Sequence, residues 1–246
     1  MSHTESLEQY WKPEPERDYQ RTFDQAPQIQ HAYNEPGQPV VVACIDEGMP
    51  RGRNVAFIAG SGILEEDSVI DPLLGSGAIH GMTSHAGCGA AALAAREAGF
   101  QGDSDAYGET FAQTKAEALG IPYEGSITAS DMRRPAHVHI ADTFYVDGTA
   151  RGFNPNLVDG APLGFVHSRG IFGSAEVGQR QVELGIAIAM GPHGFGERFT
   201  TEHPFHVVVI TDNQPGSVPL GTLLQEAEAV AAGNPRVKVH GVTIGA

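Results

Sequence analysis

The sequence predicts an α/β fold with a central, largely parallel sheet flanked by helices. Apolar runs of strand length alternate with stretches that have the composition of helices, which is the pattern of a layered α/β protein. The chain has 246 residues, of which 41% are hydrophobic, so it can bury a sizeable core. No Pro/Ser-rich linker divides it. We therefore expect a single domain over residues 38–246, preceded by an N-terminal arm at residues 1–37.

The arm is polar, rich in Glu, Gln and Pro, and ends in Asn-Glu-Pro-Gly-Gln-Pro. We expect it to be helical around Ser6–Tyr10 and irregular elsewhere. Its aromatic residues Tyr10, Trp11 and Tyr33 favour docking on a surface such as a partner subunit, and a flexible leader is the alternative.

The first part of the domain is predicted to contain three strands and three helices. The apolar runs Val40–Ile45, Asn54–Ala59 and Ala78–Ser84 have the length of strands. Asp67–Leu74 is expected to be a short helix or a turn, and Gly89–Gly99 is an Ala-rich helix with Gly99 near its C-cap. A further helix begins at Ser104 or Tyr107 and ends at Leu119, before Gly120 and Pro122.

The second part turns mainly to strands. An alternating pattern predicts a strand at Ala136–Val146, and apolar runs predict strands at Leu184–Met190, Phe205–Thr211 and Val237–Val242. Leu220–Ala232 is predicted to be a helix. The sequence shows no internal repeat of fixed period.

The charge of the chain argues against some classes of partner. It has 15 basic and 30 acidic residues, a net charge of −15, and no basic cluster. This composition disfavours nucleic acids and anionic membranes as partners. There is no signal-peptide pattern at the start and no apolar window of membrane-helix length. The two cysteines are therefore expected to be thiols in a cytoplasmic protein.

Both thiols stand in settings typical of metal ligands. Cys44 ends the first apolar run, and His85 and Cys88 lie three residues apart before the Ala-rich helix. Two thiolates and one imidazole are a ligand set for Zn²⁺ that leaves one position open, as in catalytic sites. Asp46 lies two residues beyond Cys44, so on a continuing strand it would face the same side. A carboxylate there can orient a bound water or occupy the open position itself.

Other readings of these residues and of the remaining histidines stay open. The thiols can instead be buried as small hydrophobes, and His80 is a rival ligand to His85. His137 and His139 share one face of a predicted strand, so they form either a second metal site or a packed pair. His193 lies in a predicted loop, as either a solvated residue or a proton shuttle.

Two motifs resemble those of β-class carbonic anhydrases. CIDEG at Cys44–Gly48 and HAGCG at His85–Gly89 resemble the Cys-x-Asp-x-Arg and His-x-x-Cys-Gly motifs of that family. Cys44–Glu47 and Cys88–Ala91 are also similar to the limiting-CO2-inducible group of carbonic anhydrases. The resemblance covers roughly residues 40–150. One position departs from it, because Gly48 stands where the family has the arginine that pairs with the aspartate; Arg51 or Arg53 could replace that arginine.

The resemblance implies a β-carbonic-anhydrase-like fold and a zinc lyase that interconverts CO2 and bicarbonate through a zinc-bound hydroxide. It also implies a homodimer or a higher homo-oligomer. Cys44, His85 and Cys88 would hold Zn²⁺, and Asp46 would be the catalytic residue beside the open position. Val55, Phe57 and Ile58 are candidate walls of an apolar pocket. The alternatives are a zinc-binding protein without hydratase activity, a hydrolase acting on COS or CS2, and a metal-free interaction protein.

Overall fold

The computed structural model describes residues 7–12, 14, 16–27, 29–50, 52, 54–136 and 138–245. These residues form an α/β fold with two four-stranded sheets, both flanked by helices. Every pairing between neighbouring strands in the two sheets is parallel. The single central sheet predicted from the sequence is therefore wrong in one respect, since the strands divide between two sheets.

The first sheet has the order β2-β1-β3-β4. Its strands are β1 (Val40–Ala43), β2 (Val55–Phe57), β3 (Ile79–His85) and β4 (Tyr123–Ile127). The helices between them are α3 (Asp67–Leu74), α4 (Gly89–Glu97) and α5 (Ser104–Leu119). β1 pairs directly with β3, with Val42 opposite Met82, so the C-terminal ends of these two strands lie side by side.

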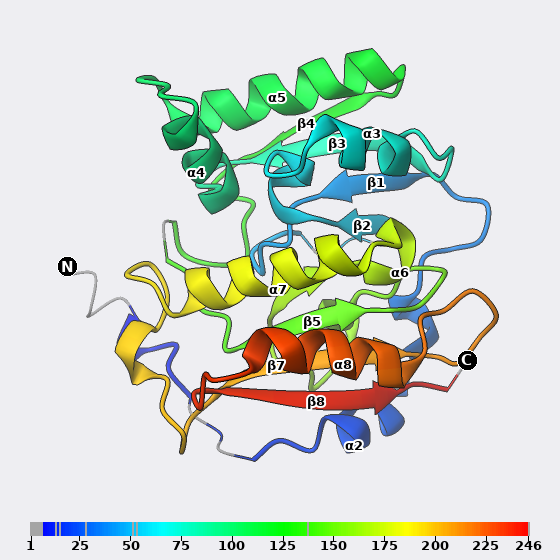
Figure 1. Cartoon of the computed structure of the whole chain (residues 1–246), viewed down its shortest axis with the longest axis vertical. Coiled ribbons are helices and arrows are strands. Elements are labelled where there is room, and N and C mark those ends of the chain that lie inside the picture. Colours follow the sequence, from blue (N-terminus) through cyan, green and yellow to red (C-terminus); the bar gives the residue numbers. More distant parts are fainter. Residues whose placement is uncertain are drawn as a thin grey trace.

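The second sheet has the order β6-β5-β7-β8, which repeats the topology of the first. Its strands are β5 (Thr143–Asp147), β6 (Phe165–His167), β7 (Phe205–Thr211) and β8 (Val237–Thr243), and its helices are α6 (Arg169–Phe172), α7 (Ala175–Ala189) and α8 (Leu220–Ala231). Figure 1 shows α7 and α8 in front of this sheet and the N-terminal helix α2 (Tyr19–Asp24) below β8.

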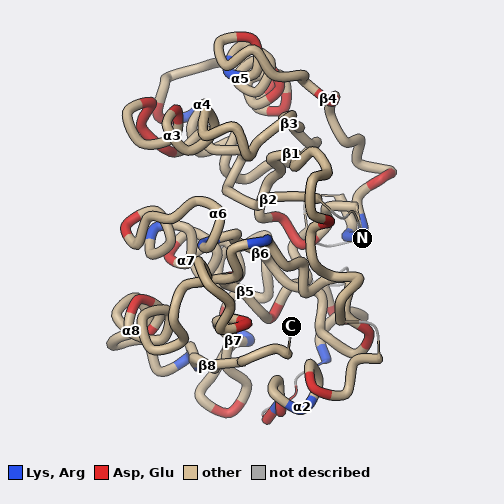
Figure 2. Tube along the Cα trace, turned by 90° about the vertical axis from the view of Figure 1, so that its right-hand side faces the viewer, with Lys and Arg blue, Asp and Glu red and all other residues tan. Residues whose placement is uncertain are grey.

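The two sheets meet at their edge strands β2 and β6 (Figure 2). The Ser168 N–H donates to the Phe57 carbonyl, at 3.0 Å, and the Phe57 N–H donates to Ser168 Oγ, also at 3.0 Å. Val166 donates in the same way to the carbonyl of Ile45, at 3.0 Å. The end of β1, where the candidate ligands begin, is therefore tied to the second sheet.

The described part of the N-terminal arm packs on its own chain. Phe23 on α2 makes edge-to-face contacts with Tyr145 and Phe153, and the ring of Tyr33 lies 5.0 Å from that of Phe153. Tyr33 and Phe153 also form an isolated antiparallel bridge. These contacts place the arm against the second sheet.

Two predicted strands differ in the structure. Leu184–Ala189 belongs to helix α7, with Met190 as its C-cap, and Ser174 caps the start of this helix by accepting a hydrogen bond from the Val177 N–H. A short apolar run fits a buried helix and a buried strand equally well, and the preceding cap decides between them here. The strand predicted at Ala136–Val146 is shorter than expected, because residues 138–142 lie in an irregular connector between the sheets.

Lys and Arg are scattered singly or in small groups, and the described residues form no continuous basic stripe (Figure 2). None of the helices in the described part of the chain has both the length and the hydrophobicity that crossing a bilayer requires.

Candidate metal centre

The three predicted ligands come together at one edge of the first sheet. Cys44 directly follows β1, His85 is the last residue of β3, and Cys88 is the N-cap of α4. Parallel neighbours end at the same edge of a sheet, and this brings the three side chains into one place. Their candidate ligand atoms all lie within 4.8 Å of one another, with 3.9 Å between the two sulfurs, and all three residues are buried.

These side chains fit a tetrahedral metal ion. With a zinc–sulfur distance of about 2.3 Å, two sulfur ligands of one zinc lie about 3.8 Å apart, close to the separation of Cys44 and Cys88. His85 Nδ1 lies 3.0 Å from the Ala86 carbonyl, which orients the ring and leaves Nε2 as the free nitrogen. That Nε2 is buried and has no hydrogen-bond partner among the described residues. The group can therefore hold a metal ion.

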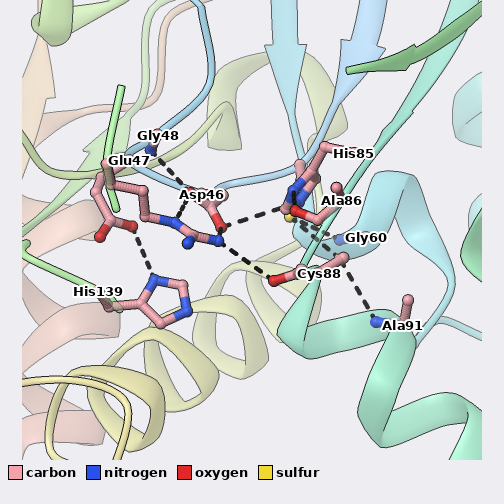
Figure 3. Close-up of polar contacts among 12 residues, drawn as sticks. Asp46, Glu47, Gly48, Gly60, His85, Ala86, Cys88, Ala91 and His139 are labelled. Carbon is pink, nitrogen blue, oxygen red and sulfur yellow. Dashed lines mark hydrogen bonds and ion pairs between the residues drawn. The ribbon is translucent and has the colours of Figure 1, made fainter. Parts of the chain in front are cut away.

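Backbone N–H groups support the two sulfurs. The Gly60 N–H donates to Cys44 Sγ at 3.1 Å, and the Ala91 N–H donates to Cys88 Sγ at 3.5 Å (Figure 3). The hydrogen bond from the Cys44 thiol lowers the pKa of Cys88; burial opposes this, and the Ala91 N–H reinforces it. Cys88 is thus prepared as the thiolate that a metal requires.

Asp46 lies beside this group and is held by an arginine. Arg134 Nε and Nη2 donate to the two carboxylate oxygens of Asp46, at 2.7 Å and 2.6 Å, in a buried bidentate pair. Asp46 Oδ2 lies 3.9 Å from His85 Nε2. Burial of Asp46 favours the protonated acid, but the hydrogen bonds from Arg134 and nearby positive charges hold its pKa well below the usual range. Asp46 is therefore an ionised carboxylate that can only accept hydrogen bonds.

Gly48 provides the space that Arg134 occupies. A Cβ atom at this position would lie 2.5 Å from Arg134 Cγ and 2.9 Å from Met132 Cε. The Gly48 N–H donates to Asp46 Oδ1 at 2.8 Å, and its carbonyl accepts the Arg133 N–H at 2.7 Å. Arginine is thus absent from position 48, and the guanidinium reaches Asp46 from the connector between the sheets.

Arg134 also joins the two motifs. Its Nη2 donates to the Gly87 carbonyl at 3.3 Å, next to Cys88, while it holds Asp46 two residues beyond Cys44. Arg51 and Arg53, the predicted partners of Asp46, lie outside the described residues. Sequence reasoning missed Arg134; its only local signal is the Arg133–Arg134 pair, the one place in the sequence where two basic residues adjoin.

A second buried group adjoins the first. His139 Nδ1 lies 3.0 Å from Glu47 Oε2, and Glu47 Oε1 accepts the Ile140 N–H at 2.7 Å (Figure 3). Ligand atoms of Asp46, Glu47 and His139 also lie within 4.8 Å of one another. Arg134 already neutralises Asp46, however, and burial of His139 is outweighed by the charge and hydrogen bond of Glu47, which raise its pKa. These internal cations make a second metal ion here unfavourable.

Two cavities open beside the ligands. The inner one, about 10 Å³, is lined by Cys44, Asp46, His139 and Phe165, among others. That volume is at the lower limit for holding one water molecule. The outer one, about 480 Å³, lies between α4, the start of α5 and the C-terminal end of α7, and Cys88 and His139 line it. Its remaining lining is largely apolar, with Leu93, Leu184 and Ile188 among the residues.

The other predicted site residues lie elsewhere. His80 is exposed on β3 and is not part of the ligand group, and His137 lies outside the described residues. Val55, Phe57 and Ile58, the predicted pocket walls, line neither cavity. His193 lines the outer cavity, and its carbonyl accepts the His139 N–H at 2.6 Å.

Comparison of the chain with protein-family models, with curated proteins and with solved structures finds no match in any of the three. What the site can do must therefore be argued from its own geometry.

Proposed function

We propose that the protein is a zinc lyase that interconverts CO2 and bicarbonate. The observation that carries this proposal is the pairing of a buried Cys-His-Cys ligand group with an ionised carboxylate beside its open side. Cys44, His85 and Cys88 would hold the ion. Zinc, when bound, supplies acidity, since it lowers the pKa of a coordinated water to about 7.

Asp46 orients the attacking oxygen. Because the carboxylate stays ionised, it can only accept, so an O–H group in the inner cavity must direct its hydrogen to Asp46 and its lone pair elsewhere. Arg134 acts through Asp46 as a positioning residue, since it fixes both carboxylate oxygens. The glycine at position 48 favours the alternative of a zinc-binding protein without activity, but Arg134 supplies Asp46 with the arginine partner that position 48 lacks.

The lining of the cavities suits a small apolar substrate. Phe165, Leu184 and Ile188 form an apolar wall of the inner cavity, and the last two continue into the outer one. An apolar path admits CO2 and excludes large polar molecules. COS and CS2 share this chemistry and are tested in the same assay.

The proposal is tested by metal analysis and by stopped-flow CO2 hydration on protein purified without chelator. We expect one zinc per chain and hydration well above background. Cys88→Ser should lose the zinc, and Asp46→Asn should keep it and lose activity by about 100-fold or more. The matched control is Glu226→Gln, because Glu226 accepts an equally bidentate pair from Arg169 Nε and Nη2, outside the lining of both cavities.

Stoichiometric zinc without hydration of CO2, COS or CS2 would leave a zinc-binding protein. Absence of bound metal would overturn both the enzyme and the binding protein, and would favour a metal-free role for the buried thiols.

A further inference from the structure

The pair formed by Glu47 and His139 is not needed to hold a metal ion, yet it is buried and held by several hydrogen bonds. The side chain of Glu47 is fully buried, and both of its oxygens are occupied, one by His139 Nδ1 and the other by the Ile140 N–H. The backbone N–H of His139 is held by the His193 carbonyl. The ring is thus fixed through Nδ1, which leaves Nε2 as the nitrogen available for exchange with other groups.

His139 stands between the two cavities. Of the titratable side chains, it is the one that lines both the inner cavity, shared with Cys44 and Asp46, and the outer cavity, shared with Cys88 and His193. Figure 3 shows its Nδ1 directed at Glu47, with the rest of the ring turned away from that carboxylate. Among the described residues, His139 is therefore the titratable side chain that can carry a proton from the inner cavity to the outer one.

We propose that His139, held by Glu47, relays protons between the inner cavity beside the metal ligands and the outer cavity. This inference rests on the proposed hydration of CO2, a reaction that releases one proton per turnover. Glu47 is the positioning residue of the relay, because it fixes the ring through Nδ1.

The proton balance of the relay is simple. An O–H bond of a water molecule in the inner cavity breaks, the oxygen keeps the electron pair, and His139 Nε2 takes the proton. Nδ1–H stays on the ring and continues to donate to Glu47 Oε2, so the imidazolium charge is balanced by a carboxylate. Nε2 then gives the proton to water or a buffer base in the outer cavity, and the neutral ring is restored.

The charges around His139 are consistent with this exchange. Glu47 and Asp46 stabilise the imidazolium, while Arg134 disfavours it. On the outer side, Arg96, Asp103 and Asp105 line the outer cavity together with His193 and Cys88. The outer cavity therefore has polar groups at which a proton can be handed to solvent, although most of its wall is apolar.

The test measures separately the rate at which CO2 and bicarbonate interconvert and the rate at which the released proton leaves the site. Isotope exchange of ¹⁸O between CO2 and water at equilibrium and stopped-flow hydration would be measured for the wild type, His139→Ala and Glu47→Gln. We expect His139→Ala to lower kcat by about 100-fold, with kcat/KM nearly unchanged, and added imidazole to restore kcat. His80→Gln is the matched control, because that histidine is exposed on β3, and it should behave as the wild type.

A second measurement does not depend on activity. The ring protons of His139 would be titrated by NMR in metal-free protein, assigned by their loss in His139→Ala. We expect a pKa above the ordinary 6.5 of histidine in the wild type and a lower pKa in Glu47→Gln, where the carboxylate charge is gone. This variant also serves if His139→Ala does not fold.

The outcomes are distinguishable. A wild type that hydrates no CO2 would overturn the proposed function and the relay with it. An active wild type in which the His139 variant is unaffected, or in which kcat and kcat/KM fall together without rescue by imidazole, would overturn the relay alone. A pKa of His139 that does not respond to Glu47→Gln would overturn the positioning role of Glu47.

Discussion

The Asp46–Arg134 pair makes a prediction that does not depend on any metal. Both side chains are nearly inaccessible to solvent, at 3% and 1% relative exposure. Removing the guanidinium in Arg134→Ala leaves a buried carboxylate without its cation, which costs about 3 to 5 kcal/mol. We expect that loss in the free energy of unfolding at pH 7, measured by urea denaturation in the presence of a chelator.

The loss should shrink in acid. In the wild type the pKa of Asp46 is depressed, so its stabilising contribution is present above the unfolded pKa of 3.8 and is lost as pH falls through the folded value. In Arg134→Ala, burial without the cation raises the pKa of Asp46. Lowering the pH then protonates the carboxyl and relieves the penalty, so the gap between the two proteins narrows from pH 7 towards pH 4.

Two comparisons make this measurement decisive. Asp46→Asn/Arg134→Ala removes both charges and should be more stable than Arg134→Ala alone at pH 7. Arg169→Ala removes the same two donors from Glu226, whose side chain keeps 14% exposure, so its loss should be smaller. A loss below about 1 kcal/mol for Arg134→Ala, or a double variant no better than the single one, would refute the buried-pair reasoning.

The remaining predictions concern the metal and the space beside it. Zinc at 100 times its dissociation constant should stabilise the chain by about 2.7 kcal/mol and raise Tm by about 5 to 10 °C; calorimetry should show no such shift for Cys88→Ser. Burial lowers the pKa of His85, but its interactions with Cys44 and Asp46 raise it to about 9 in the metal-free site. The hydrogen bond with Cys88, together with burial, raises the pKa of Cys44. Zinc binding at pH 7.5 should therefore release about two protons, seen by titration calorimetry in buffers of different ionisation enthalpy, and affinity should rise with pH. Gly48→Ala should displace the side chain of Arg134 and lower both CO2 hydration and the free energy of unfolding. An unchanged free energy of unfolding, measured by urea denaturation, would show that the site relaxes freely around the added methyl group.

The local part of the candidate site could be predicted from the sequence. Cys44 ends an apolar strand, and His85 and Cys88 flank a short turn before a helix, so strand pairing alone brings them together. The two motifs also contain Asp46. This spacing can be read from the sequence because each motif lies at the end of one strand.

The rest of the site depends on contacts between distant segments. Arg134 reaches Asp46 across 88 positions from a connector whose described residues form no helix or strand. No periodicity in the sequence indicates such a contact. His139 was predicted on a strand, but its neighbour Ile140 donates its N–H to Glu47 instead of to a ladder. The division into two sheets was missed for a similar reason, because the short strands β4 and β6 carry little pattern of their own.

The connector at residues 128–142 should tolerate inserted residues less well than most linkers do. Surface connections normally tolerate inserted residues, because their length matters less than their ends. Here Arg134 and His139 reach the two carboxylates of one loop, Asp46 and Glu47, from positions five residues apart. An insertion between them would put one contact out of register while leaving both sheets intact. The segment that joins the two sheets thus sets the distance between these two contacts, so the candidate site requires a connector of fixed length.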